Sequence, residues 1–198
     1  MHNRGRGYRN EFRIIAGDWR RRRLGFPLLP GIRPSPDRVR ETLFNWLQGR
    51  VTGMRCLDLF AGSGALGLEA LSRGAASCVF VDRERAVIET LRAHLAALHA
   101  RGGDALQSEA MAFLGGPARA FDLVFLDPPF ASELLPRALH ELCTGAWLRP
   151  GACIYVEYAA GHAPSLPDGW QWWREARAGQ VGYGLVSSAL GQAHPQPA

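Results

Sequence analysis

From residue 54 onward, apolar runs of strand length alternate with helical segments, and this alternation most strongly constrains the fold. Seven runs have the length and apolar character of strands, at residues 54–60, 77–82, 105–108, 121–127, 152–158, 170–177 and 181–190. Helical patterns separate the first five of them, at 64–74, 83–100, 109–114 and 132–143. Strands separated by helices form βαβ units, in which helices cover both faces of a parallel sheet. The sequence therefore predicts an α/β fold with a doubly wound, mostly parallel seven-stranded sheet.

The first fifty residues precede this alternation and predict a separate extension. Short apolar runs flank the turn signal Gly17-Asp18, which is typical of a β-hairpin. Prolines then give way to Val39, Leu43 and Leu47 at helical spacing, with Asp37 near the helix start as a candidate cap. We expect four segments: a disordered basic arm (1–11), a hairpin and helix extension (12–50), the main domain (51–190) and a disordered tail (191–198).

Length and composition exclude several classes of protein. A chain of 198 residues suits one domain. It has no run of about 18 apolar residues, so no transmembrane helix is expected, and no apolar segment of a secretion signal follows its first residues. The four cysteines lie far apart without a CxxC pair, which argues against a metal site and favours buried free thiols. We expect a cytoplasmic monomer without metal.

Charge separates the N-terminal segment from the rest of the chain. The net charge is +5, and every basic residue other than histidine is arginine. Residues 1–40 hold eleven arginines and three acidic residues, so a strongly basic arm precedes a slightly acidic body. This distribution favours a partner with a phosphate backbone. The alternative is a solvated arm that makes no contact with nucleic acid.

A glycine-rich loop follows the first strand of the main domain and opens a helix. In its sequence, DLFAGSGALG, Gly62, Gly64 and Gly67 match GxGxxG, a pattern that brings the backbone close to a nucleotide ligand. Asp82 ends the next strand, 20 residues after Gly62. In a parallel sheet this carboxylate lies beside the glycine loop, where it can accept hydrogen bonds from both ribose hydroxyls. This layout serves both NAD and S-adenosylmethionine.

Asp58 distinguishes between these two cofactors. It lies four residues before the first glycine, at the carboxyl end of its strand. A carboxylate there suits the ammonium group of an amino acid and repels a pyrophosphate. The chain also lacks lysine, and with it the Tyr-x-x-x-Lys pair of many NAD-dependent enzymes. We therefore expect S-adenosylmethionine as cofactor and S-adenosylhomocysteine as product.

The fourth strand ends in a second loop, Asp127-Pro128-Pro129-Phe130. Its prolines remove two N–H donors and leave a rigid loop of acceptors. The Asp127 carboxylate and the Pro128 carbonyl can accept both hydrogens of an exocyclic amine and direct its lone pair at a sulfonium methyl. Phe130 offers a face on which a base can stack. These four residues are the predicted catalytic set, and the target base must be unpaired or flipped out of a duplex.

With these loops in place, the chain resembles the class I methyltransferases that carry an (N/D)PP(Y/F) loop. Within them it is similar to the RsmD family, which methylates N2 of a guanine in bacterial 16S ribosomal RNA. The resemblance covers about Phe12 to Leu190. Its most specific block is RPSPDRVRETLFNWL, before the first strand, and it includes RIIAGDWRRRRL, EAMAFL and IYVEY. It implies a Rossmann-like class I methyltransferase fold and a 16S RNA substrate in the small ribosomal subunit or an assembly intermediate.

The resemblance also implies roles for individual residues. Asp58, Gly62 and Gly64 would hold the methionine part of the cofactor, Asp82 its ribose, and Glu109 with Ala110 its adenine. The remaining expected cofactor residues are Phe60, Arg83 and Asp127. The expected RNA contacts all lie in the extension: Arg20, Arg22, Arg33, Arg38 and Arg40. The last three could also contact the cofactor, and the alternative for them is salt bridging with Asp37 and Glu41 on the helix surface.

Other classes remain open at this point. A DNA adenine-N6 or cytosine-N4 methyltransferase could use the same loops, although 198 residues leave little room for a target-recognition region. A protein amide methyltransferase leaves the basic arm unexplained. A non-catalytic RNA-binding assembly factor has no need of Asp58, Asp82 and Asp127 together. Trp170, Trp172 and Trp173 are expected to pack against the core rather than against bases.

Overall fold

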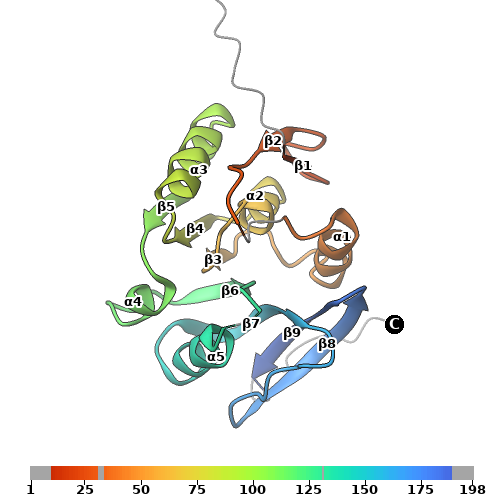
Figure 1. Ribbon diagram of the computed structural model, residues 1–198, viewed down its shortest axis with the longest axis vertical. Coiled ribbons are helices and arrows are strands. Elements are labelled where there is room, and N and C mark those ends of the chain that lie inside the picture. The colour runs from red at the N-terminus through yellow and green to blue at the C-terminus, as the bar shows by residue number, and fades with distance from the viewer. Residues whose placement is uncertain (1–9, 31–33, 131, 189–198) are drawn as a thin grey trace, which may run out of the picture.

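The computed structural model describes residues 10–30, 34–130 and 132–188. Its centre is a seven-stranded sheet in the order β5-β4-β3-β6-β7-β9-β8 (Figure 1). Strands β3 to β7 pair in parallel, whereas β9 is antiparallel to both β7 and β8. The predicted fold class is thus confirmed. The strands are β3 (Arg55–Asp58), β4 (Ser77–Asp82), β5 (Gly103–Gln107), β6 (Phe121–Leu126), β7 (Leu148–Ala159), β8 (Trp170–Ala178) and β9 (Val181–Ser188).

Two hydrophobic cores cover the two faces of this sheet. Successive residues of a strand point to opposite faces, so Phe125 joins one core while Val124 and Leu126 join the other. The first core is closed by α1 (Asp37–Trp46), α2 (Ala65–Ser72) and α3 (Arg85–Ala97). The second is closed by α4 (Ala110–Leu114) and α5 (Leu134–Thr144). Because both faces are covered, the central strands are mostly apolar, with charged residues at or near their ends.

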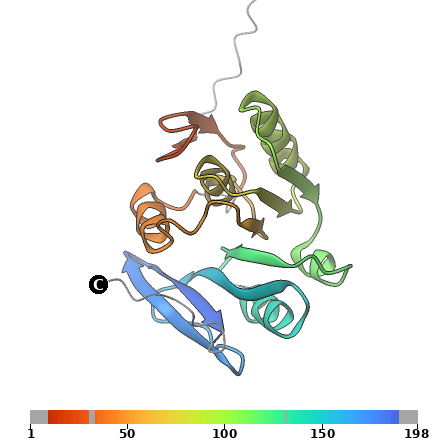
Figure 2. The same cartoon turned by 180° about the vertical axis from the view of Figure 1, so that it is seen from behind.

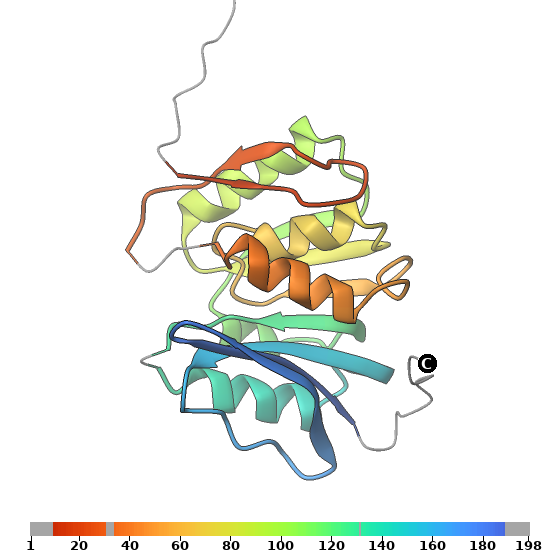
Figure 3. The same ribbon diagram turned by 90° about the vertical axis from the view of Figure 1, so that its right-hand side faces the viewer.

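The predicted N-terminal hairpin is present as β1 (Glu11–Arg13) and β2 (Arg23–Gly25), which pair antiparallel. It begins one residue earlier than expected. Phe12 and Leu24 lie opposite each other and are buried in the first core. His94 of α3 donates from Nε2 to the carbonyl of Gly25 at 2.6 Å, and the hairpin lies along α3 and α2 in Figure 3. The predicted arm and tail fall largely (1–9) or wholly (191–198) outside the described residues.

The two ends of the sheet differ in how well the sequence predicts them. The weak strand expected at 105–108 begins at Gly103, because its pairing with β4 starts at Cys78. At the opposite end, seen from behind in Figure 2, β9 lies between β7 and β8, an order that the sequence does not indicate. Trp170 and Trp172 pack against the second core and Trp173 against the first, so the packing interpretation of these tryptophans is confirmed.

The strand order creates a crevice at the carboxyl ends of β3 and β6. Strand β3 lies between β4 and β6, and the chain leaves β3 toward α2 and leaves β6 toward α5, on opposite faces of the sheet. Loops that diverge in this way leave the space in which α/β proteins bind ligands. Among the described residues, no helix is long and apolar enough to cross a membrane.

Candidate active site

A cavity of about 740 Å³ opens at this crevice. It is within the range of small-molecule sites. The loops after β3, β4 and β6, the carboxyl half of β7 and the segment before α1 all contribute to its walls. The N-terminal extension therefore covers part of the site that the main domain forms.

The glycine loop forms one wall of the cavity and depends on two backbone conformations. Gly62 and Gly64 have φ angles of 50° and 77°, in the left-handed region that favours glycine. Gly62 lines the cavity, but Gly64 does not. A Cβ on Gly64 would lie 2.3 Å from Leu91 of α3, and one on Gly67 would lie 2.3 Å from the Phe80 ring. Gly64 and Gly67 therefore permit close packing, and the expected cofactor contact of Gly64 stays a prediction.

Asp82 lies at the end of β4 and is tied to the glycine loop. Its Oδ2 accepts a hydrogen bond from the Gly62 N–H at 2.9 Å, and its Oδ1 accepts one from the Glu84 N–H at 2.9 Å. Each oxygen retains a lone pair, and the side chain lines the cavity. The carboxylate is thus held in place for a pair of hydroxyl donors.

Asp58 lies deeper, at the end of β3, and is 3% exposed. Its Oδ2 accepts from the Gly67 N–H at 3.1 Å. Burial raises the pKa of Asp58 to about 8, with smaller contributions from the charges of Asp82 and Glu157, while the Gly67 hydrogen bond opposes the shift. In the ligand-free protein this carboxyl therefore holds a proton at neutral pH.

The DPPF loop forms the wall opposite the glycine loop. Asp127 follows β6 directly, and burial raises its pKa well above the usual value, reinforced by the charges of Glu157 and Asp58. Pro128 is buried, whereas the Phe130 ring is 47% exposed. The loop therefore combines a fixed acceptor at its start with an accessible aromatic face at its end.

Glu157 is a member of the site that the sequence reasoning missed. It lies in β7, is 3% exposed and lines the cavity. Its Oε1 accepts from the Ser35 hydroxyl at 2.5 Å and from the Tyr155 hydroxyl at 2.9 Å. Burial raises its pKa, and these two donors oppose the shift. The sequence did contain a signal, a carboxylate within the apolar run ACIYVEY. Burying a charged group is costly unless it has a partner, so a glutamate at that position indicates a specific role.

Four buried or half-buried carboxyl groups thus face one cavity: Asp58, Asp82, Asp127 and Glu157. None of them forms an ion pair with a described residue. Uncompensated carboxyls in a buried site favour a cationic ligand, because such a ligand lowers the cost of ionising them. S-adenosylmethionine carries an ammonium and a sulfonium group, so its positive charges suit these carboxyl groups. No cluster of the described residues has the composition of a metal site.

The structure brings together most of the predicted site residues. The four residues of the DPPF loop all line the cavity. The expected cofactor residues that line it are Asp58, Phe60, Gly62, Asp82, Arg83, Glu109, Ala110 and Asp127. Glu109 and Ala110 begin α4, beyond the end of β5. Asp104, in β5 itself, does not line the cavity.

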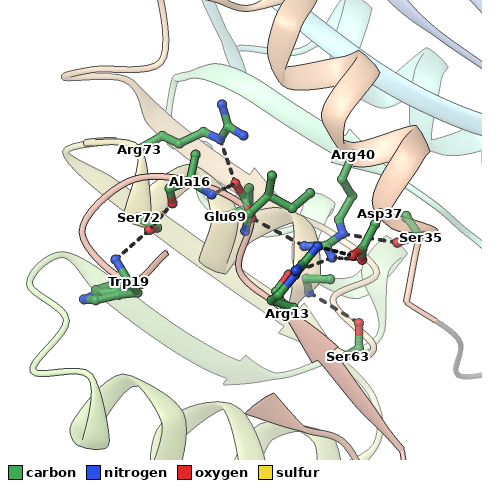
Figure 4. Close-up of polar contacts among 12 residues, drawn as sticks. Arg13, Ala16, Trp19, Ser35, Asp37, Arg40, Ser63, Glu69, Ser72 and Arg73 are labelled. Carbon is green, nitrogen blue, oxygen red and sulfur yellow. Dashed lines mark hydrogen bonds and ion pairs between the residues drawn. The ribbon is translucent and has the colours of Figure 1, made fainter. Parts of the chain in front are cut away.

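Arg40, an expected RNA contact, requires correction because its side chain is fully buried. It donates to the Ser35 and Arg13 carbonyls at 3.2 and 2.8 Å and to Asp37 Oδ1 at 2.6 Å. It also pairs with Glu69 of α2 at 3.4 Å (Figure 4). The alternative of salt bridging is met in part, because Arg40 pairs with Asp37, but it does so from inside the protein and its second acidic partner is Glu69. These bonds use the guanidinium inside the protein, so it is not available to RNA.

Glu69 is the acidic centre of this buried network and is fully buried itself. It accepts from the Ile15 and Ala16 N–H groups at 2.8 and 3.0 Å and from Arg73 at 2.7 Å. The network therefore attaches the chain after β1 to α2, the helix that the glycine loop opens. Its central members are drawn in Figure 4.

The other predicted RNA contacts lie in different surroundings. Arg38 is exposed on α1, and Arg33 lies outside the described residues. Arg20 and Arg22 are exposed in the turn of the hairpin. That turn is attached near the last residue of α2, where the Trp19 N–H donates to Ser72 Oγ at 3.0 Å. The cavity lies at the first residues of α2, so these two arginines are about one helix length from it.

The fold and this cavity define a class I methyltransferase. A ribosomal protein L11 methylase of Lactobacillus delbrueckii subsp. bulgaricus has the same fold, with a TM-score of 0.62 at 17% identity over 80% of this chain and 82% of that one. A family model described as conserved hypothetical protein 95 matches residues 12–187. The chain belongs to this family, the RsmD family.

Several curated relatives carry the name ribosomal RNA small subunit methyltransferase D. The protein of Escherichia coli strain K12 is 47% identical over 176 residues, which are 88% of this chain and 89% of that one. The protein of Haemophilus influenzae is 42% identical over 184 residues, 91% and 95% of the two chains. The solved structure of yhhF from Escherichia coli has a TM-score of 0.83 at 46% identity, covering 90% of this chain and 98% of that one.

Proposed function

We propose that this enzyme transfers a methyl group from S-adenosylmethionine to the exocyclic N2 amine of a guanine in small-subunit ribosomal RNA. The observation that carries the proposal is the position of Asp127. Its carboxyl group begins an aromatic-tipped loop and faces the same cavity as Asp58 and Asp82. The names of the curated relatives support the RNA substrate.

The cofactor residues have distinct tasks in this proposal. Asp58 and the backbone around Gly62 hold the amino-acid part, and Asp82 accepts the ribose hydroxyls. Glu109, Ala110 and Phe60 flank the adenine, with Arg83 at the rim. The bound cofactor supplies a methyl group that its sulfonium already activates.

The DPPF loop prepares the amine for attack. The guanine amine is a poor nucleophile because its lone pair is delocalised into the ring. Asp127 and the Pro128 carbonyl accept its two hydrogens and direct the lone pair toward the methyl group, while Phe130 stacks on the base. As the N–C bond forms, the methyl–sulfur bond breaks and leaves S-adenosylhomocysteine. The methylated nitrogen then carries a positive charge and loses one proton readily, so Asp127 acts mainly as the acceptor that orients the amine. Exclusion of water strengthens these hydrogen bonds.

We propose a monomeric cytoplasmic enzyme that meets its RNA in the small subunit or an assembly intermediate. The exposed arginines Arg20, Arg22 and Arg38, together with Arg33, would contact phosphates. A cavity at the surface of a small domain contacts few nucleotides and therefore recognises little RNA sequence. We infer that the folded RNA particle presents the target base to it. No metal takes part in this reaction.

The substrate is tested with tritiated S-adenosylmethionine. The enzyme is incubated separately with 16S ribosomal RNA, with small subunits that lack the modification, and with duplex DNA, and the products are digested to nucleosides. We expect label in N2-methylguanosine from RNA or subunits. Label only in DNA adenine or cytosine would support methyl transfer to an amine but contradict the RNA substrate. Failure to bind the cofactor would contradict the proposed methyltransferase activity itself.

Cofactor binding is expected to release protons at pH 7. The pKa of Asp58 is about 8 in the ligand-free protein, so its carboxyl is mostly protonated at this pH. An ammonium ligand lowers that pKa and expels the proton, and affinity therefore rises with pH until the free carboxyl ionises near pH 8. Calorimetry in buffers of different ionisation enthalpy measures the release.

Asp58→Asn is the matched control for this prediction, since an amide oxygen can still accept from the Gly67 N–H. It should release fewer protons than the wild type, the remainder coming from other carboxyls of the cavity. A binding enthalpy independent of buffer in the wild type would contradict the prediction.

A further inference from the structure

A second cavity, of about 460 Å³, adjoins the first on the far side of the DPPF loop. The two cavities share Pro128, Pro129, Phe130 and Glu157. The remaining walls of the second cavity come from the start of α5 and from the chain after β7. A base that entered through it would meet the Phe130 ring and Glu157, which both cavities share.

Asp127, which directly follows β6, and Glu157 of the neighbouring strand β7 occupy equivalent positions in the strand register. Leu126 of β6 pairs with Val156 of β7 in parallel register, so each carboxyl-bearing residue comes one position later. Leu126 and Val156 both face the second core, and the residues that follow them therefore point to the opposite face of the sheet. Parallel strands lie about 4.8 Å apart, which places the two carboxyls side by side.

Only one oxygen of Glu157 is used within the described protein. Oε1 accepts the two hydroxyls of Ser35 and Tyr155. No described residue forms a hydrogen bond with Oε2. Because the side chain is 3% exposed and lines both cavities, this oxygen is a fixed acceptor beside the DPPF loop.

We propose that Glu157 recognises the target guanine by accepting its N1–H while Asp127 accepts a hydrogen of the N2 amine. The inference rests on the proposed function and assigns it a base-recognition residue. The N1–H and the amine are neighbouring donors on the Watson–Crick edge of guanine, and two neighbouring carboxyl groups match them. The Ser35 and Tyr155 hydroxyls hold Glu157 in the orientation that this contact needs.

This arrangement selects guanine among bases that carry an exocyclic amine. In adenine and cytosine the ring nitrogen beside the amine is an unprotonated acceptor, which a carboxylate repels. A site built to accept a hydrogen bond discriminates strongly against a base that lacks the donor, because a buried acceptor is then left unpaired. Glu157 thus supplies the selectivity that the DPPF loop alone lacks.

The test removes the N1–H from the target base and the carboxylate from Glu157 in turn. Small subunits are reconstituted with 16S ribosomal RNA that carries, at the position that wild type methylates, either guanine or 2-aminopurine, which keeps the amine and lacks the N1 proton. Wild type, Glu157→Gln and Glu175→Gln are compared. Glu175 is the matched control, because it also accepts a tyrosine hydroxyl, that of Tyr158 at 3.1 Å, but lines neither cavity.

We expect wild type and Glu175→Gln to prefer guanine over 2-aminopurine by about 10- to 100-fold in kcat/KM. In Glu157→Gln the amide oxygen keeps the Ser35 and Tyr155 hydroxyls, so an NH2 group takes the place of Oε2 and cannot accept the N1–H. This variant should lose about that factor on guanine and little on 2-aminopurine, so that its preference collapses. Equal losses on both bases or an unchanged preference would overturn the inference. Absence of guanine methylation by the wild type would instead overturn the proposed function, and the inference that rests on it.

Discussion

Asp127→Ala is expected to lower kcat by about 10²- to 10⁴-fold, a larger effect than on the affinity for S-adenosylmethionine, which Asp58 and Asp82 also hold. The side chain leads the DPPF loop, faces the cavity beside Asp58 and Glu157, and forms no ion pair with a described residue. Its removal leaves the amine hydrogens without their main acceptor. Single-turnover methylation of small subunits, together with calorimetry of cofactor binding, separates the two effects.

Asp127→Asn distinguishes an acceptor from a base. An amide oxygen still accepts one amine hydrogen, so this variant should retain activity within about tenfold of wild type. Asp122→Asn is the matched control, because Asp122 belongs to the same strand but pairs with Arg149 and the Arg55 N–H at its opposite end. If Asp127→Asn were as inactive as the alanine variant, the negative charge rather than the acceptor geometry would be the essential property.

Arg40→Ala is expected to lower the free energy of unfolding by about 3–5 kcal/mol, because it leaves buried partners of the guanidinium unpaired. For a domain of this size that corresponds to a decrease in Tm of about 6–20 °C. The affected groups come from β1, the segment before α1, and α2. Thermal and urea unfolding measure the change.

Arg38→Ala is the matched control for this prediction. Arg38 lies on the same helix, two residues earlier, and is exposed, so its removal should change stability by no more than about 0.5 kcal/mol. Its effect should instead be weaker binding of RNA. If the Arg40→Ala variant were as stable as the wild type but bound RNA more weakly, the original expectation that Arg40 contacts RNA would be supported.

The candidate site could be predicted to a large extent because its residues lie where strands end. Asp58, Asp82 and Asp127 follow parallel strands, and the carboxyl ends of such strands meet at one edge of a sheet whatever the details of packing. Glu157 was missed because it lies within an apolar strand, where the sequence does not show which face the residue takes or which cavity it reaches.

The arginines of the extension were harder to interpret for a related reason. Arg38 and Arg40 are two residues apart on one helix, so they point in different directions. The sequence does not show which of them faces the protein, because that depends on Glu69, 29 residues beyond Arg40. Arg40 has a structural role because the fold places the buried carboxylate of Glu69, in α2, beside it.

The sequence by itself determined the α/β class, the seven strands, the hairpin and the two ligand loops, because hydrophobic periodicity, glycine and proline act locally. Only the tertiary structure decided the position of β9 between β7 and β8, the burial of Arg40 and the pairing of Glu157 with Asp127 in a shared site. These features depend on contacts between residues distant in the chain. Such contacts form when whole elements pack, and local propensities do not encode them.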